Sequence, residues 1–258
     1  MVFLTNNVVS LQRLMKKWKE MNYQDYELKE YANERQWVAT EAFPMLMRKV
    51  YVWMTLALVI TGMTAYGVAH TPALLQMFLG SGLFWVVAIA ELAIVIGISA
   101  AINRLSLTAA TLLFVLYSVL NGITMSFIFL AYTASSISTV FLITAGTFGA
   151  MALVGYTTKT DLSSMGKILF MALIGLIIAT IVNIFVKSSG LDMIISYVGV
   201  LIFVGLTAWD SQKIKQMMLQ APDASESMQK LALLGALTLY LDFINLFIYL
   251  LRIFGKRE

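Results

Sequence analysis

Three acidic residues lie within or at the end of long apolar runs, where a charged side chain is unusual. Glu91 sits inside WVVAIAELAIVIG, Asp210 closes the run in VGLTAWDSQKIK, and Asp242 lies in the middle of LTLYLDFINLFIYLLRIFG. An ionised carboxylate at the centre of a membrane helix costs about 2.5–3.5 kcal/mol on insertion scales. Such groups usually face a bundle interior or a water-filled cavity, so all three are candidates for proton or cation chemistry.

Polar residues in the last of these runs share one face of a helix. The set is spaced by 4, 3, 4 and 3 residues and comprises Thr238, Asp242, Asn245, Tyr249 and Arg252. At about 100° per residue, these positions fall within a stripe roughly 80° wide. Hydrogen bonds between helices, worth about 0.6 kcal/mol each, are enough to explain Thr238 and Tyr249. They do not explain Asp242, because Asn or Ser could form such bonds without a charge, and we interpret Asp242 as functional.

Other chemistries known from helical membrane proteins fit this sequence poorly. The last run has no lysine for a retinal Schiff base, and His70, the single histidine, lies at the edge of a run rather than beside a mid-membrane serine. Asp210 and Asp242 could form the pair of an aspartyl intramembrane protease, but their neighbours do not resemble the Tyr-Asp and Gly-x-Gly-Asp motifs of those enzymes. There is no cysteine and no phosphate-binding glycine motif. We therefore expect neither an enzyme nor a bound cofactor.

Small and polar residues elsewhere in the runs are expected to pack helices together. Ala145 and Gly149 lie four residues apart, a spacing that permits close approach of two helices. Asn121 and Asn183 are interpreted as hydrogen-bonding contacts between helices rather than as ligands.

The elements that position these residues are predicted to be membrane-spanning helices. The 258 residues are 60% hydrophobic and 12% charged, whereas soluble domains are about 45–50% apolar and about 25% charged. Mean hydropathy is +0.82. Apolar runs occur near residues 50–70, 82–102, 108–132, 138–157, 168–187, 192–210 and 231–251, and each has about the 20 residues that cross a hydrocarbon core. We predict an all-α membrane protein: a seven-helix domain over residues 46–258 after a polar tail over residues 1–45.

The basic residues predict the orientation. They fall in the tail and in the second, fourth and sixth connections, as Arg13, Lys16, Lys17, Lys19, Lys29, Arg35, Arg48, Lys49, Arg104, Lys159, Lys167, Lys213, Lys215 and Lys230. The only basic residue in the first, third and fifth connections is Lys187. Because cytoplasmic loops carry the excess of Lys and Arg, we expect a cytosolic N-terminus. Seven crossings would place Arg252, Lys256 and Arg257 outside, so the last run either crosses or enters and returns.

The N-terminal tail has two interpretations. Leu11, Leu14, Met15 and Trp18 recur at helical spacing among lysines, which is typical of a basic amphipathic helix on an anionic membrane surface. A mostly solvated tail with a weak helix fits equally well. Basic residues flank the runs rather than forming the blocks that bind nucleic acid, so no nucleic-acid partner is expected.

The last two runs carry a motif that resembles a known family. LTLYLDFINLFIYLLRIFG and the preceding VGLTAWDSQKIK are similar to the C-terminal signature of the transmembrane Bax inhibitor motif family. Further matches are Glu91, NGIT at residues 121–124, TKTDLS at residues 158–163 and NIF at residues 183–185. The resemblance covers about residues 45–255 and leaves out the tail.

This resemblance implies a seven-helix bundle with the last helix at its centre. Family members are cation-permeable, pH-sensitive calcium leak proteins, linked in eukaryotes to restraint of cell death. Their proposed sensor is a pair of aspartates on the sixth and seventh helices, which match Asp210 and Asp242. An arginine after the second span is thought to latch one of them, and Arg104 is the nearest candidate here.

Elementary electrostatics fits such a sensor. Two carboxylates in a low dielectric cannot both ionise cheaply, so Asp210 and Asp242 would share one proton and titrate as a unit. Loss of that proton leaves charge that must find Ca²⁺, water or a cation such as Arg104. Ca²⁺ prefers hard oxygen ligands, and a weak site completed by water suits release. We assign supporting roles to Glu91, Asn245 and Tyr249.

The sequence thus favours a pH-sensitive Ca²⁺ leak channel, with Ca²⁺ and H⁺ as its ions and the bilayer as its surroundings. A proton-coupled secondary transporter that uses Asp242 is one alternative, although no inverted repeat is evident. A non-conducting regulator that acts on membrane-protein partners, including proteases or death regulators, is another. We expect a bacterial inner membrane, or an endoplasmic-reticulum-type membrane if the source is eukaryotic.

Overall fold

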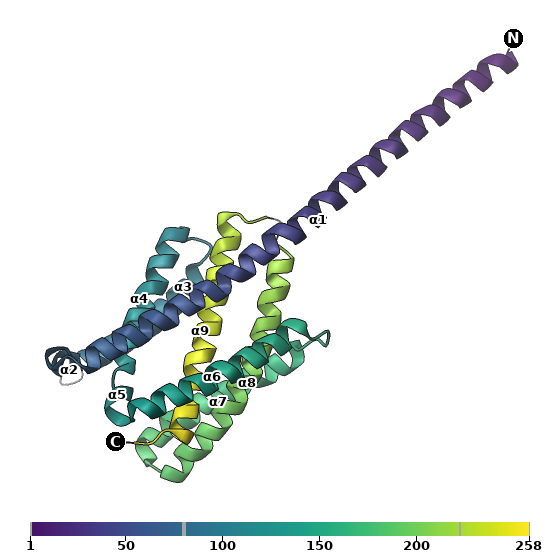
Figure 1. Ribbon diagram of the computed structural model, residues 1–258. Coiled ribbons are helices and arrows are strands. Elements are labelled where there is room, and N and C mark those ends of the chain that lie inside the picture. Colours follow the sequence, from purple (N-terminus) through teal and green to yellow (C-terminus); the bar gives the residue numbers. More distant parts are fainter. Residues whose placement is uncertain (1, 79–80, 222, 258) are drawn as a thin grey trace.

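The computed structural model describes residues 2–78, 81–221 and 223–257, and the side chains of residues 17–31, 41–78, 81–221 and 223–257. These residues form helices in the order α1 (Val2–Ala69), α2 (Pro72–Phe78), α3 (Leu83–Ala101), α4 (Leu107–Met125), α5 (Ile128–Ala131), α6 (Ala134–Thr157), α7 (Ser163–Val186), α8 (Ser189–Leu219) and α9 (Glu226–Phe254) (Figure 1). The one strand-like feature among the described residues is an isolated bridge between Tyr132 and Arg257. The predicted all-α class is confirmed.

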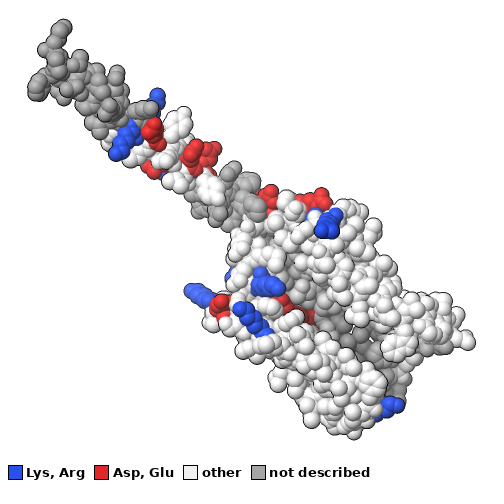
Figure 2. Space-filling model, turned by 180° about the vertical axis from the view of Figure 1, so that it is seen from behind, with Lys and Arg blue, Asp and Glu red and all other residues white. Residues whose placement is uncertain are grey.

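Seven of the described helical segments are long and apolar enough to cross a membrane. Their bounds are Glu41–Ala69, Leu83–Ala101, Leu107–Ala131, Ala134–Thr157, Ser163–Val186, Ser189–Leu219 and Glu226–Phe254. Each overlaps one predicted run, so the number and order of the spans are confirmed. Figure 2 shows a wide uncharged belt over the bundle, with most of the visible charged side chains near the N-terminal extension.

The N-terminal tail and the first span form a single helix. α1 runs for 68 residues and contains Pro44, and its N-terminal half projects away from the bundle (Figure 1). Of the amphipathic positions predicted in the tail, Trp18 is exposed. The side chains of Leu11, Leu14 and Met15 lie outside the described residues.

The last helix is at the centre, as predicted. Buried residues make up 67% of the apolar stretch of α9 and only 6% of that of α7. α9 packs against α1, α4, α6 and α8, whereas α3 packs against α4 and α7 against α8. Since the central helix touches several others at once, a polar group on α9 has its surroundings set by tertiary packing.

The two ends of α9 lie at opposite ends of the bundle. At its start, Lys49 Nζ donates to Gln229 Oε1 (2.7 Å) and Leu107 N to Glu226 Oε1 (2.9 Å). Past its end, Thr133 N donates to the carbonyl of Lys256 (3.1 Å), beside the start of α6. A continuous helix of 29 residues is about 43 Å long at 1.5 Å per residue, which exceeds the bilayer core. This geometry favours a last run that crosses over one that enters and returns.

Candidate functional site

Asp210 and Asp242 lie side by side in the interior of the bundle. Asp210 is on α8 and Asp242 is on α9, and their side chains are 6% and 5% exposed. The two carboxyl groups are within side-chain hydrogen-bonding contact and interact electrostatically. The two aspartates that the sequence suggested as a pair are thus brought together, although they are far apart in the chain.

The chemistry of this contact depends on a proton. An ionised carboxylate only accepts hydrogen bonds, so two of them cannot bond to each other unless one carries a proton. Asp242 Oδ2 is buried without a hydrogen-bond partner among the described residues. A buried acceptor left in this way is costly, and a proton shared with Asp210 would satisfy it.

One basic group interacts with the pair, and it lies on the same helix as Asp210. The charge of Lys213, one turn further along α8, attracts Asp210. Lys213 Nζ also lies 4.9 Å from the centroid of the Trp209 ring. A cation is therefore within electrostatic reach of the pair, but it comes from α8 rather than from the α3–α4 turn.

Close approach of α6 fixes the position of α8 beside the pair. A Cβ atom on Gly155 would overlap the carbonyl oxygen of Ala208. Only glycine allows these two backbones to meet, and Ala208 is two residues before Asp210. The sequence did not single out Gly155, because nothing in its local pattern shows which helix faces it.

The polar stripe predicted on the last span largely faces α8. Tyr249 stacks on Phe203 with ring centroids 5.8 Å apart, and its ring fills the space over Gly199. Arg252 Nη1 lies 3.3 Å from Asp192 Oδ1. Later residues of α9 meet earlier residues of α8, so the two helices are antiparallel. Much of the stripe therefore lies in the interface between α8 and α9, which also contains the carboxyl pair.

Two members of that stripe bond within their own helix. Thr238 Oγ1 donates to the carbonyl of Leu234 (3.1 Å), and Asn245 Nδ2 donates to that of Leu241 (2.8 Å). Neither bond reaches Asp210 or Asp242, and the supporting role of Asn245 stays a prediction.

Glu91 belongs to a second polar cluster on the other side of α9. Its carboxylate accepts from Thr124 Oγ1 (2.9 Å) and Asn121 Nδ2 (3.3 Å), both on α4. The Tyr240 hydroxyl donates to Asn121 Oδ1 (2.9 Å) and lies 2.7 Å from Thr61 Oγ1 on α1. This cluster links α1, α3, α4 and α9, so the structure does not bring Glu91 to the aspartate pair.

Sequence reasoning missed the role of Tyr240 and Thr61 in this cluster. Tyr240 is fully buried and Thr61 is 3% exposed. The only signal was two hydroxyl side chains in apolar runs, which is too common to single them out. Asn121, by contrast, does bond between helices, as predicted.

Arg104 lies exposed in the turn between α3 and α4. Among the described side chains the only ion pair within 4.0 Å is that of Arg252 with Asp192, so Arg104 forms no such pair with Asp210 or Asp242. The adjacent carbonyl of Leu105 accepts from Lys230 Nζ (2.9 Å), which ties this turn to the start of α9. The latch stays a prediction.

The described side chains do not offer a preformed metal centre. No three of their His, Cys, Asp and Glu residues gather to hold a metal ion. Asp210 and Asp242 supply two carboxylates, whereas Ca²⁺ takes about 6–8 oxygen ligands. The weak Ca²⁺ site at these two carboxylates stays a prediction.

Comparison with known proteins gives one family. The family model described as "Inhibitor of apoptosis-promoting Bax1" matches residues 44–258. The inner membrane protein YbhL of Escherichia coli is 51% identical over 214 residues, which cover 82% of this chain and 92% of that protein. An uncharacterized protein of Borreliella burgdorferi is 45% identical over 213 residues, which cover 82% of this chain and 92% of that protein. An uncharacterized protein of Rickettsia prowazekii is 43% identical over 218 residues, which cover 84% of this chain and 92% of that protein.

Proposed function

This chain belongs to the membrane-protein family described as inhibitor of apoptosis-promoting Bax1, and we propose that it is a pH-sensitive Ca²⁺ leak channel. The observation that carries the proposal is the contact between the buried carboxyl groups of Asp210 and Asp242. This contact lies between α8 and the central helix α9. A change of charge there acts directly on the packing of the most buried helix.

The shared proton sets the direction of gating. With the proton present, a hydrogen bond between Asp210 and Asp242 holds α8 and α9 together. Without it, the two carboxylates repel each other. In general, two like charges about 4 Å apart repel by about 4 kcal/mol at an effective dielectric constant of about 20. That repulsion is large compared with single contacts between membrane helices. Deprotonation therefore favours an arrangement in which α9 shifts and water reaches the pair, so Ca²⁺ flux rises with pH.

The same carboxylates serve as the ion-binding groups of the pathway. Two charges attract a divalent cation, and incomplete coordination by the protein keeps binding weak enough for release. Asp210 and Asp242 are thus both the sensor and the weak Ca²⁺ site in this proposal.

We place this channel in a bacterial inner membrane with its N-terminus in the cytosol. The Escherichia coli relative is an inner membrane protein. The excess of Lys and Arg on the side of the tail supports the orientation.

Ca²⁺ flux into proteoliposomes, measured as a function of pH, tests the proposal. Asp210→Asn and Asp242→Asn should each abolish the pH dependence, because neither leaves a proton-sharing pair. Asp161→Asn is the matched control. Asp161 is exposed in the loop before α7, and hydrogen bonds from Ser163 hold its pKa below the usual range, so it stays ionised in the assay. If the Ca²⁺ flux of both Asp210→Asn and Asp242→Asn kept the pH dependence of wild type, the two aspartates would not be the pH sensor.

The same assay separates the alternatives. Flux that saturates with Ca²⁺ and responds to an opposing proton gradient would indicate a proton-coupled transporter. Absence of flux, together with loss of cellular function on deletion of residues 1–40, would indicate a regulator that acts through the tail.

A further inference from the structure

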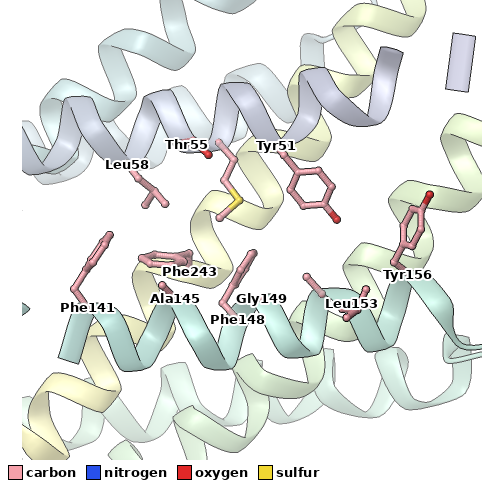
Figure 3. Close-up of a pocket in the computed structure, with 12 residues that line it drawn as sticks. Tyr51, Thr55, Leu58, Phe141, Ala145, Phe148, Gly149, Leu153, Tyr156 and Phe243 are labelled. Carbon is pink, nitrogen blue, oxygen red and sulfur yellow. The ribbon is translucent and has the colours of Figure 1, made fainter. Parts of the chain in front are cut away.

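An apolar groove of about 540 Å³ separates α1 from α6. Figure 3 shows α1 on one side of it, α6 on the other, and Phe243 of α9 at its floor. Phe243 is held there by Phe141 and Phe148 of α6, each with its ring centroid 5.4 Å away. The groove lies on a different face of α9 from Asp242, which points to α8.

Two small residues on α6 line the groove and do not pack against another helix. Ala145 and Gly149 were expected to let another helix approach, but both line the groove and are exposed. A Cβ atom added to Gly149 would meet nothing within 4 Å. This contrasts with Gly155 on the same helix, where a Cβ atom would strike the backbone of α8. The expectation of close packing at residues 145 and 149 was wrong, because the neighbouring helix that they face stands apart.

The shape and lining of the groove suit one acyl chain. The α6 residues that line it extend from Phe141 to Tyr156, which is about 22 Å at 1.5 Å per residue. Half of a hydrocarbon core is about 15 Å thick, so a chain from one leaflet can lie along the groove. Met54 and Leu58 of α1 and Leu153 of α6 complete an apolar wall. If the groove were empty, these side chains would lose their dispersion contacts on one side.

One end of the groove carries polar groups that fit a lipid phosphate. Tyr51 and Tyr156 lie at that end (Figure 3). Lys215 Nζ donates to the carbonyl of Tyr156 (2.6 Å) and lies 4.9 Å from the centroid of its ring. That bond uses one of the three donors of the ammonium group. Tyr and Lys at the end of an apolar path are typical of the level of lipid headgroups.

We propose that the groove between α1 and α6 binds one phospholipid, with an acyl chain along Gly149 and Phe243 and its phosphate beside Lys215. The shape of the groove accommodates the chain, and the positive charge of Lys215 attracts the phosphate. Lipid tails are as apolar as the groove, so packing and the headgroup contact supply the affinity. This site does not depend on Ca²⁺ conduction.

Native mass spectrometry of the full-length chain in detergent tests the site, with palmitoyl-oleoyl phosphatidylglycerol as the added lipid. Gly149→Phe should fill the groove and lower retention of one lipid at least about fivefold, or about 1 kcal/mol. Gly175→Phe on α7 is the matched control, because Gly175 is exposed with nothing within 4 Å of an added Cβ atom. Ala145→Phe serves as a second filling variant. Unchanged melting temperatures establish that the variants are folded.

A second arm tests the headgroup contact. Lys215→Gln should weaken binding of phosphatidylglycerol about tenfold and leave binding of a diacylglycerol with the same chains unchanged. The proposal would be overturned if Gly149→Phe retained as much phosphatidylglycerol as wild type and Gly175→Phe do. So would a dimer that dissociates on Gly149→Phe, since a second copy would then occupy the groove. Equal loss of both lipids in Lys215→Gln would overturn the phosphate contact.

Discussion

Tyr240 and Asp242 are two residues apart on α9 and point to different neighbours. The hydroxyl of Tyr240 meets Asn121 and Thr61 on α4 and α1, whereas the carboxyl group of Asp242 meets Asp210 on α8. Both side chains are almost fully buried. The central helix therefore carries a hydrogen-bond cluster on one face and the contact between two carboxyl groups on another.

Thermal stability should depend on pH through the aspartate pair. As pH rises and the shared proton leaves Asp210 and Asp242, like charges meet in a buried site, so the wild-type melting temperature falls. Asp242→Asn removes one charge and should flatten this fall between about pH 5 and about pH 9. At the high-pH end of this range, its melting temperature should exceed that of wild type by about 2–4 °C for each kcal/mol of repulsion that is removed. Circular dichroism melts in one detergent provide the measurement. A fall of equal slope in wild type and Asp242→Asn would contradict the shared proton.

The hydrogen bond between Tyr240 and Asn121 should stabilise the fold. Tyr240→Phe removes the hydroxyl that bonds Asn121 and leaves the Asn121 oxygen short of a donor, so we expect a loss of about 1–2 kcal/mol. A double-mutant cycle with Asn121→Ala should give a coupling energy of about 0.6 kcal/mol, and at most about 1.7 kcal/mol. Tyr197→Phe is the control, since Tyr197 is 53% exposed on α8. Equal effects of the two Tyr→Phe changes would argue against the cluster.

Two glycines of α6 should respond oppositely to alanine. Gly155→Ala places a Cβ atom against the carbonyl of Ala208 and should cost about 1–3 kcal/mol or more, because α6 and α8 must separate. A Cβ atom on Gly149 meets no protein atom within 4 Å, so Gly149→Ala should stabilise α6 by about 0.5–1 kcal/mol. Unfolding in a denaturing detergent compares the two. Similar costs for both changes would mean that α6 does not approach α8 as described.

The two termini should lie on opposite sides of the membrane. The chain has no cysteine, so single cysteines introduced by Lys29→Cys and Lys256→Cys can be labelled without background. A membrane-impermeant maleimide added to intact cells should react with Lys256→Cys, whereas Lys29→Cys should react only after permeabilisation. Labelling of both from outside, or of neither, would contradict a last helix that crosses.

Much of the architecture could be predicted from local sequence. Apolar runs of about 20 residues must become helices in a membrane, since every backbone group must find a hydrogen bond within its own segment. The number of spans and the polar stripe of the last one follow from that rule together with helical spacing. The rarity of acids in such runs drew attention to Asp210 and Asp242, and the family motif suggested that they form a pair.

What faces each helix was decided only by the tertiary structure. The spacing of Ala145 and Gly149 is the same whether a helix or an open groove lies opposite, and here it is a groove. Likewise, nothing local distinguishes Glu91, which bonds to α4, from the acids that meet between α8 and α9. Sequence determines what a helix presents on each face, because that depends on helical spacing alone. Which neighbour meets that face depends on how all the helices pack together.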